Sequence, residues 1–126
     1  MPTAVLLIAH GSRLKEANDD LLFVAEGMRA EGQYPIVETC FLELADPDIP
    51  TGGRRCVAAG ADRVLMLPYF LSPGLHVTED LQAVRDQLAT AYPQAEWLLC
   101  DPIGRHPLLM QILYERLREA SERTSQ

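Results

Sequence analysis

The stretch LLIAHGSRLKEAN, from Leu6 to Asn18, decides how the chain begins to fold. It opens with a continuous apolar run, which is typical of a buried strand, and polar residues follow directly after Ala9. From Leu14 onward, apolar residues recur at helical spacing with charged residues between them. Ser12 is the predicted N-cap, because its hydroxyl can accept a hydrogen bond from a free backbone N–H. The stretch therefore predicts a buried strand, a short polar turn and an amphipathic helix that ends at Gly32.

The same alternation of strand and helix continues along the rest of the chain. Further strands are predicted at 36–42, 63–67 and 96–100, and further helices from Asp48 toward Ala59, from Thr78 to Tyr92 and from Pro107 to Ala120. Gly52 and Gly53 argue against the second helix, since each costs about 1 kcal/mol relative to alanine in a helix interior. The pattern predicts a three-layer α/β/α domain with a four-stranded parallel sheet, formed by residues 1–126 as a single domain.

The composition narrows the classes of function. The net charge is −7 and no basic stripe occurs, which argues against a nucleic-acid partner. No apolar stretch approaches the roughly 20 residues of a membrane span, and the N-terminus lacks the pattern of a signal peptide. The three cysteines, Cys40, Cys56 and Cys100, lie far apart and form no C-x-x-C pair. Reduced, buried thiols in a cytoplasmic protein are therefore expected.

All three histidines and one isolated carboxylate follow predicted strands. His10, Glu43, His76 and His106 come after the first, second, third and fourth strand, and ligands of open parallel sheets bind beyond these strand ends. Near neutral pH an imidazole can accept a proton or bind a divalent metal, and the lack of a thiolate favours a metal in transit. Each group also has a structural alternative. A histidine can simply be hydrogen-bonded at a strand end, Glu43 can bind a backbone N–H, and His106 can belong to a helix cap before Pro107.

Common motifs for other chemistries are absent. The chain has no G-x-G-x-x-G after its first strand, no G-x-S-x-G and no phosphate-binding loop of the G-x-x-x-x-G-K-[ST] type. Gly11 and Ser12 precede a helix and could cradle an anion, which leaves a phosphate-ester enzyme as a third hypothesis.

Four stretches, taken together, resemble the small class II tetrapyrrole chelatases, and most closely the CbiX-type sirohydrochlorin cobaltochelatases and their ferrochelatase relatives. They are LLIAHGSRLKEAN, CFLELADPDIP, GADRVLMLPYFLSPGLHVTEDL and DPIGRHPLL, and the resemblance extends from Val5 to about Leu117. The combination of HGSR, P-x-F-L-x-x-G-x-H-V and G-x-H-P is specific, whereas any one of these pieces alone is weak.

The resemblance implies a chelatase-like fold and an enzyme that inserts Co²⁺, Fe²⁺ or Ni²⁺ into a sirohydrochlorin-type tetrapyrrole, on the way to cobalamin or siroheme. The metal is then a substrate, and no cofactor is permanently bound. By the same resemblance, His10 and His76 hold the incoming metal and assist the loss of the pyrrole protons. Glu43 acts as a base or as a carboxylate that delivers the metal. A non-catalytic carrier of tetrapyrrole or divalent metal on the same fold remains the alternative.

The resemblance also implies how the substrate and a second subunit take part. Sirohydrochlorin is a polycarboxylate, so Ser12, Arg13, Arg105 and His106 are candidates to bind it, and Arg54 is a further nearby cation. The alternative for each arginine is a solvated surface charge. The chain is about half the length of the two-domain members, which implies a homodimer with a shared cleft.

Overall fold

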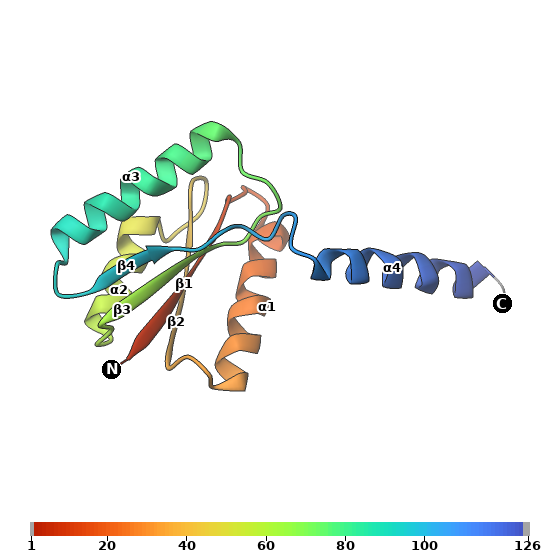
Figure 1. Ribbon diagram of the computed structural model, residues 1–126, viewed down its shortest axis with the longest axis horizontal. Coiled ribbons are helices and arrows are strands. Elements are labelled where there is room, and N and C mark those ends of the chain that lie inside the picture. The colour runs from red at the N-terminus through yellow and green to blue at the C-terminus, as the bar shows by residue number, and fades with distance from the viewer. Residues whose placement is uncertain (1, 125–126) are drawn as a thin grey trace.

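The computed structural model describes residues 2–124 and contains a four-stranded parallel sheet with helices on both faces (Figure 1). The strand order is β2-β1-β3-β4. The strands are β1 (Thr3–Ala9), β2 (Ile36–Phe41), β3 (Arg63–Pro68) and β4 (Glu96–Leu99). The helices are α1 (Lys15–Glu31), α2 (Ile49–Ala58), α3 (Leu75–Ala91) and α4 (Leu108–Thr124). The predicted α/β/α architecture is confirmed, with α1 on one face of the sheet and α2 and α3 on the other.

The central strand β1 explains why this sequence forms a three-layer fold. Residues 4–8 are buried, and β1 pairs with β2 on one side and with β3 on the other. Its alternate side chains enter two separate cores: Leu6 and Ile8 pack on the α2 and α3 side, and Val5 and Leu7 pack beneath α1. A strand that is covered on both faces has no polar side to show, so it reads as one continuous apolar run.

Ser12 does not cap α1, so that prediction is wrong. The helix begins at Lys15, and its N-cap residue Leu14 makes no side-chain cap hydrogen bond. Instead the Ser12 hydroxyl accepts a hydrogen bond from the Leu14 N–H at 3.0 Å. Asn18 holds the turn: its Oδ1 accepts from the Ser12 N–H at 3.0 Å, and its Nδ2 donates to the Ser12 carbonyl at 2.8 Å. The hydroxyl, the N–H and the carbonyl of Ser12 therefore all form hydrogen bonds within the turn.

The helix α3 begins three residues before the predicted cap at Thr78. Its N-cap is Gly74, which has no side chain to signal a helix start, and Thr78 Oγ1 donates back to the Gly74 carbonyl at 3.2 Å. A threonine inside a helix can bond in this way to the carbonyl four residues before it, so its presence does not by itself mark a cap. His76 consequently lies in the first turn of α3, where a loop was predicted.

The predicted helix α2 is confirmed in spite of its two glycines. Asp48 is the N-cap and accepts a hydrogen bond from the Thr51 N–H at 2.9 Å. Hydrogen bonding by Thr51, first through its side chain and then through its backbone, lowers the pKa of the Asp48 carboxyl. A Cβ on Gly52 would lie 2.9 Å from Cys40 Cβ, and a Cβ on Gly53 would lie 2.8 Å from Leu88 Cδ2. The glycines therefore let α2 approach the sheet and α3 closely, and this packing offsets their low helix propensity.

Replacement of Gly52 by alanine is expected to lower the free energy of unfolding by about 1–2 kcal/mol. Overpacking a tight contact costs about 1–3 kcal/mol, and the gain in helix propensity returns about 1 kcal/mol at most. Gly27→Ala is the matched control, because Gly27 is also inside a helix and its Cβ position has no atom within 4 Å. Urea unfolding measures both changes. A Gly52→Ala protein as stable as Gly27→Ala would contradict the close approach of α2.

The helix α4 does not cover the sheet, and the two outer layers are formed by α1 on one face and by α2 and α3 on the other. It projects away from the domain (Figure 1), and residues 110–123 are all exposed. Apolar residues lie along one side of α4, yet Ile112, Leu113 and Leu117 are 50%, 54% and 63% exposed. The helix continues to Thr124, beyond the predicted end at Ala120, and residues 125–126 lie outside the described part of the chain.

The three cysteines are all free thiols, as predicted. Cys40 and Cys56 are buried and Cys100 is half-buried. Burial raises the pKa of all three, that of Cys56 to about 12, because a thiolate is poorly solvated in an apolar interior. Within residues 2–124, no helix is both long and apolar enough to pass through a bilayer.

Candidate functional site

His10 and Glu43 lie next to each other at the carboxyl edge of the sheet. His10 follows β1 and Glu43 lies two residues after β2, and His10 Nδ1 is 3.9 Å from Glu43 Oε1. Two backbone hydrogen bonds fix this arrangement. The Leu42 N–H donates to the Ala9 carbonyl at 3.0 Å, and the Glu43 N–H donates to the His10 carbonyl at 3.2 Å. The pairing of β1 with β2 thus extends into the loops that follow these strands, as expected for parallel strands whose carboxyl ends share one edge of the sheet.

Gly11 makes this close approach possible. Its φ of +97° is in the region that favours glycine, and a Cβ there would lie 1.8 Å from the Glu43 carbonyl oxygen. Any other residue would push the loop that carries Glu43 away from His10. From the sequence, Gly11 was considered only as part of an anion cradle, whereas its role in the structure is to position Glu43.

The His10–Glu43 pair is open to solvent. The two side chains are 59% and 61% exposed, and the His10 ring packs against Phe70 with a centroid distance of 5.8 Å. At 3.9 Å the imidazole and the carboxylate are beyond hydrogen-bond reach. Each can therefore take up a cation or a proton from an incoming molecule.

A hollow of about 160 Å³ joins this pair to α3. It is lined by His10, Leu42, Glu43, Val77 and Asp80. Asp80 is a further candidate site residue that the sequence analysis did not identify. Its position relative to His76 could have identified it, because Asp80 is four residues after His76 and residues four apart lie on one face of a helix.

The structure does not join all the predicted ligands. Among residues 2–124, no hydrogen bond, ion pair or ring contact connects His76 or His106 with the His10–Glu43 pair. Nor does any group of three or more His, Cys, Asp or Glu side chains in that range stand ready to hold a metal. His76 is exposed in the first turn of α3, directly before Val77 of the hollow. The shared metal site of His10 and His76 therefore stays a prediction.

The predicted substrate-binding residues lie in two loops at this edge of the sheet. Ser12 lines a hollow of about 210 Å³ together with His10, and Arg13 is exposed beside it. Arg105 is exposed with a φ of +66°, and His106 Nδ1 accepts a hydrogen bond from the Leu108 N–H at 3.1 Å. This bond supports the cap role that was the structural alternative for His106.

The anion cradle at Ser12 loses its support. Both the Ser12 N–H and its hydroxyl oxygen are engaged within the turn, with Asn18 and Leu14 respectively. An anion would have to displace these partners, which argues against a phosphate-ester enzyme. Arg54, the further cation, is exposed on α2.

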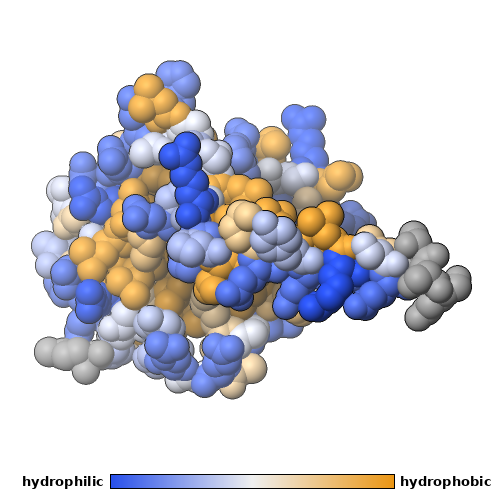
Figure 2. Space-filling view, turned by 45° about the vertical axis from the view of Figure 1, so that its right-hand side comes forward, coloured by the Kyte–Doolittle hydropathy of each residue, from blue (hydrophilic) through white to orange (hydrophobic). Residues whose placement is uncertain are grey.

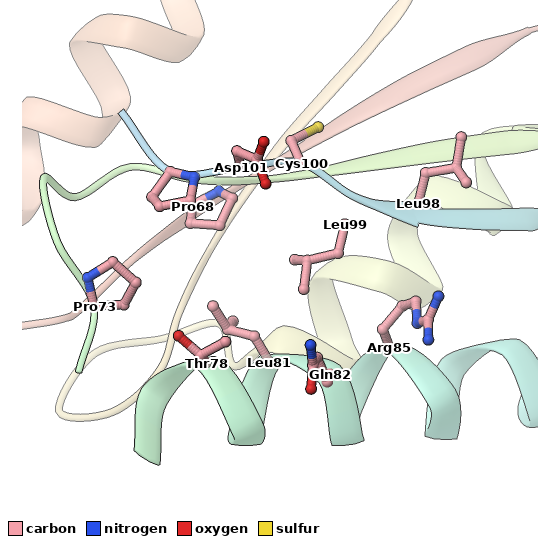
Figure 3. A pocket seen from close by; sticks show the side chains of 11 residues that line it. Pro68, Pro73, Thr78, Leu81, Gln82, Arg85, Leu98, Leu99, Cys100 and Asp101 are labelled. Atoms are coloured by element: carbon pink, nitrogen blue, oxygen red, sulfur yellow. The ribbon is translucent and has the colours of Figure 1, made fainter. Parts of the chain in front are cut away.

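Another hollow, of about 360 Å³, lies between α3 and β4 (Figure 3). Leu81, Arg85 and Leu99 are among its lining residues, and none of the predicted site residues lines it. The Arg85 guanidinium already pairs with Asp86, at 2.8 Å from Nη2 to Oδ1. The chemistry-bearing residues are therefore at the edge of the sheet and not in this hollow.

The fold and the site define a parallel α/β domain that presents imidazole and carboxylate groups at the carboxyl ends of its strands. The family model described as CbiX matches residues 4–120. The chain belongs to the CbiX family.

Individual relatives agree with this assignment. The chain is 36% identical to a sirohydrochlorin ferrochelatase of Priestia megaterium, over 94% of this chain and 44% of the relative. It superposes with a TM-score of 0.85 on the sirohydrochlorin chelatase SirB of Bacillus subtilis subspecies spizizenii in complex with cobalt, at 32% identity over 94% of this chain and 51% of that one. A CbiX protein of Marinobacter aquaeolei VT8 superposes with a TM-score of 0.84 at 26% identity, over 97% of this chain and 99% of that chain.

The lengths of these relatives differ from that of this chain. The chain spans 44% to 51% of the first curated relatives, which is about half their length. The structure from Marinobacter, in contrast, is matched almost from end to end. The domain therefore occurs both as a unit of this size and as part of longer proteins.

Proposed function

We propose that this chain inserts a divalent metal ion into a sirohydrochlorin-type tetrapyrrole. The observation that carries the proposal is the open His10–Glu43 pair, held 3.9 Å apart at the ligand-binding edge of a CbiX-family fold. Relatives named as sirohydrochlorin ferrochelatases and cobaltochelatases support the substrate class. Residues 1–126 act in this proposal as one chelatase-like domain.

Metal insertion needs two events that these side chains can assist. The macrocycle must lose two pyrrole protons, and the hydrated cation must lose water. In the proposed mechanism His10 and His76 bind the metal on one side of the ring, and Glu43 accepts a proton or delivers the cation. An exposed pair of ligands binds a metal less tightly than a closed structural site with four ligands, so the ion can leave for the ring.

The metal is a substrate, and Co²⁺, Fe²⁺ and Ni²⁺ all suit this set of ligands. Imidazole and carboxylate accept each of these ions, and the affinity order alone does not select one of them. The SirB structure with cobalt supports cobalt as a test ion. The product would serve cobalamin or siroheme synthesis in the cytoplasm, a reducing compartment in which three free thiols persist.

The substrate carboxylates would meet cations and hydrogen-bond donors around the same edge. Arg13 and Arg105 are exposed there and free to reach an acidic ligand, and Ser12 and His106 lie beside them in sequence. The two hollows that His10 lines measure about 160 Å³ and about 210 Å³, whereas small-molecule sites usually measure about 300–1,000 Å³. A tetrapyrrole therefore needs a second wall, and we propose that a second copy of the chain supplies it in a homodimer with a shared cleft.

The direct test is an insertion assay with purified protein, sirohydrochlorin and Co²⁺. We expect many turnovers per protein, followed by the change in absorption as the metallated ring forms. Binding of one ring or one metal per site, with no acceleration over the protein-free rate, would instead identify a carrier. The same assay with Ni²⁺ and with Fe²⁺ under anaerobic conditions ranks the metals.

A further inference from the structure

We propose that α4 is exchanged between two copies of the chain, and that each α4 packs on the open β3–β4 face of the other copy. This inference rests on the homodimer proposed above and specifies its contact surface. Two separate surfaces of one chain carry the argument: an apolar helix without a sheet beneath it, and an apolar sheet face without a helix above it.

The helix is the first of these surfaces. Six large apolar side chains of α4 are between 50% and 64% exposed: Leu108, Met110, Ile112, Leu113, Tyr114 and Leu117. Leu109, Ile112, Leu113 and Leu117 recur at the spacing of a single helical stripe. Helices in proteins gain most of their stability by packing an apolar face, and the stripe of this 17-residue helix has no such cover within the chain.

The sheet face is the second surface. Leu65 and Leu98 are partners in the β3–β4 ladder, so they point to the same face, opposite to the buried Val64 and Trp97. Figure 3 shows Leu98 and Cys100 on the side of β4 that points away from α3, and Leu99 on the side toward it. The helix on the former side, α1, packs on β1 and β2. Leu65, Leu67 and Leu98 are therefore only half-buried.

An apolar hollow connects the two surfaces. It measures about 310 Å³ and is lined by residues that include Leu67 of β3, Ile103 of the connecting loop, and Leu108 and Ile112 of α4. Figure 2 shows apolar surface in the middle of the domain and along the projecting helix. Asp101 and His106 also line this hollow, and a second α4 that lay along β3 and β4 would extend its apolar part.

The total exposed area of the chain is consistent with the interface that such an exchange would bury. The chain exposes 8478 Å², whereas a compact monomer of 14.0 kDa exposes about 6,700 Å² by the usual size scaling. The excess is about 1,800 Å² per chain, or about 3,600 Å² for two chains, and obligate homodimer interfaces bury about 2,000–5,000 Å².

The loop before α4 indicates that the partner is a second copy and not the same chain. The Ile103 N–H donates to the Phe70 carbonyl at 3.2 Å, and a Cβ on Gly104 would lie 1.8 Å from the Leu71 carbonyl oxygen. His106 Nδ1 then caps the start of the helix. These contacts anchor the loop up to His106, and α4 leaves it in a direction away from the domain of its own chain. Reciprocal exchange satisfies both surfaces at once and closes after two copies.

A membrane surface fits α4 less well. The three arginines of α4 are balanced by three glutamates, so the helix has no net positive charge, and the whole chain has a net charge of −7. Helices that lie on membranes are usually basic on their polar face, because cellular membranes present anionic lipids.

The test measures the mass of the full chain in solution by light scattering. We expect twice the chain mass of 14.0 kDa for the wild-type protein. Leu113→Lys should raise the dimer dissociation constant at least about 100-fold, because a dimer would bury two unpaired charges. Gln111→Lys, which adds the same charge on the opposite side of α4, is the matched control and should leave the mass unchanged. Circular dichroism confirms that both variants are folded.

A sheet-face variant distinguishes exchange from simple pairing of two α4 helices. Leu65→Lys should also yield monomers, whereas a dimer that persists in this variant would overturn the exchange. A second readout avoids altering the sheet. Iodoacetamide should alkylate Cys100 at least about 10-fold faster in Leu113→Lys than in the wild type, because α4 of the other copy covers the strand end. Equal rates, or a monomeric wild-type protein, would contradict the proposal.

The readouts of this proposal are independent of metal insertion. A dimer without turnover would overturn the proposed chelatase activity and leave the exchange intact. Turnover by a monomeric wild-type protein would support the chelatase activity and overturn the exchange.

Discussion

Alanine in place of His10 or of His76 is expected to lower the rate of metal insertion at least about 100-fold. A group that transfers a proton or binds the reacting metal contributes about 10²–10⁴-fold to a rate, and alanine provides neither function. Both side chains are exposed and make few contacts, so their loss should change stability by less than about 0.5 kcal/mol. The measurement is the initial rate of Co²⁺ insertion, with circular dichroism as the test of folding.

Glu43 and a matched control refine this prediction. Glu43→Gln should slow insertion about 10-fold or more, because the amide is neither a base nor an anionic ligand for the cation. Glu96→Gln is the control. Glu96 pairs with Arg63 at 3.9 Å and is 61% exposed, the same distance and exposure as in the His10–Glu43 pair, but it lies at the opposite end of the strands. Equal rates for Glu43→Gln and Glu96→Gln would remove Glu43 from the mechanism.

Alanine in place of Gly11 is expected to lower the free energy of unfolding by at least about 3 kcal/mol. The positive φ alone costs a non-glycine residue about 1–3 kcal/mol. The new Cβ would in addition lie 1.8 Å from a backbone oxygen of Glu43, so the loop must move and the bond between the Glu43 N–H and the His10 carbonyl would break. Insertion activity of the remaining folded protein should also fall, because Glu43 would move away from His10.

Gly60→Ala separates the two causes of this loss. Gly60 has a φ of +101°, almost that of Gly11, but its Cβ position has no atom within 4 Å. The Gly60→Ala protein should therefore lose only the cost of the backbone conformation, about 1–3 kcal/mol of stability, and keep normal activity. If both variants lost the same stability in urea unfolding, the close approach of the Glu43 loop to Gly11 would be wrong.

The order of elements could be predicted because each strand here is a short apolar run between helices. The helix starts were less certain, since they depend on single residues. At α3 the cap is Gly74, which carries no side-chain signal, and the start was predicted at Thr78. At α2 the glycines looked unfavourable until the contacts of Gly52 with Cys40 and Leu6 were known. Such contacts join residues that are far apart in the sequence, so they cannot be predicted from the helix propensity of a local segment.

Part of the site could be predicted from the order of strands and helices. The carboxyl ends of parallel strands share one edge, so His10 and Glu43 were expected to be close, and they are. The need for glycine at position 11 depends on where the second loop passes, which the sequence does not reveal. The projection of α4 was also missed, because an apolar stripe predicts that a helix is covered but not by which chain.

The measurement that tests the central claim most directly is a crystal structure of the protein with bound Co²⁺. The proposal predicts a single cobalt ion with an imidazole nitrogen of both His10 and His76 at about 2.1 Å, a typical distance between imidazole and a late first-row divalent ion. Glu43 should then lie within reach of the same ion. Cobalt bound elsewhere, or two ions that each bind one of the histidines, would contradict the proposal.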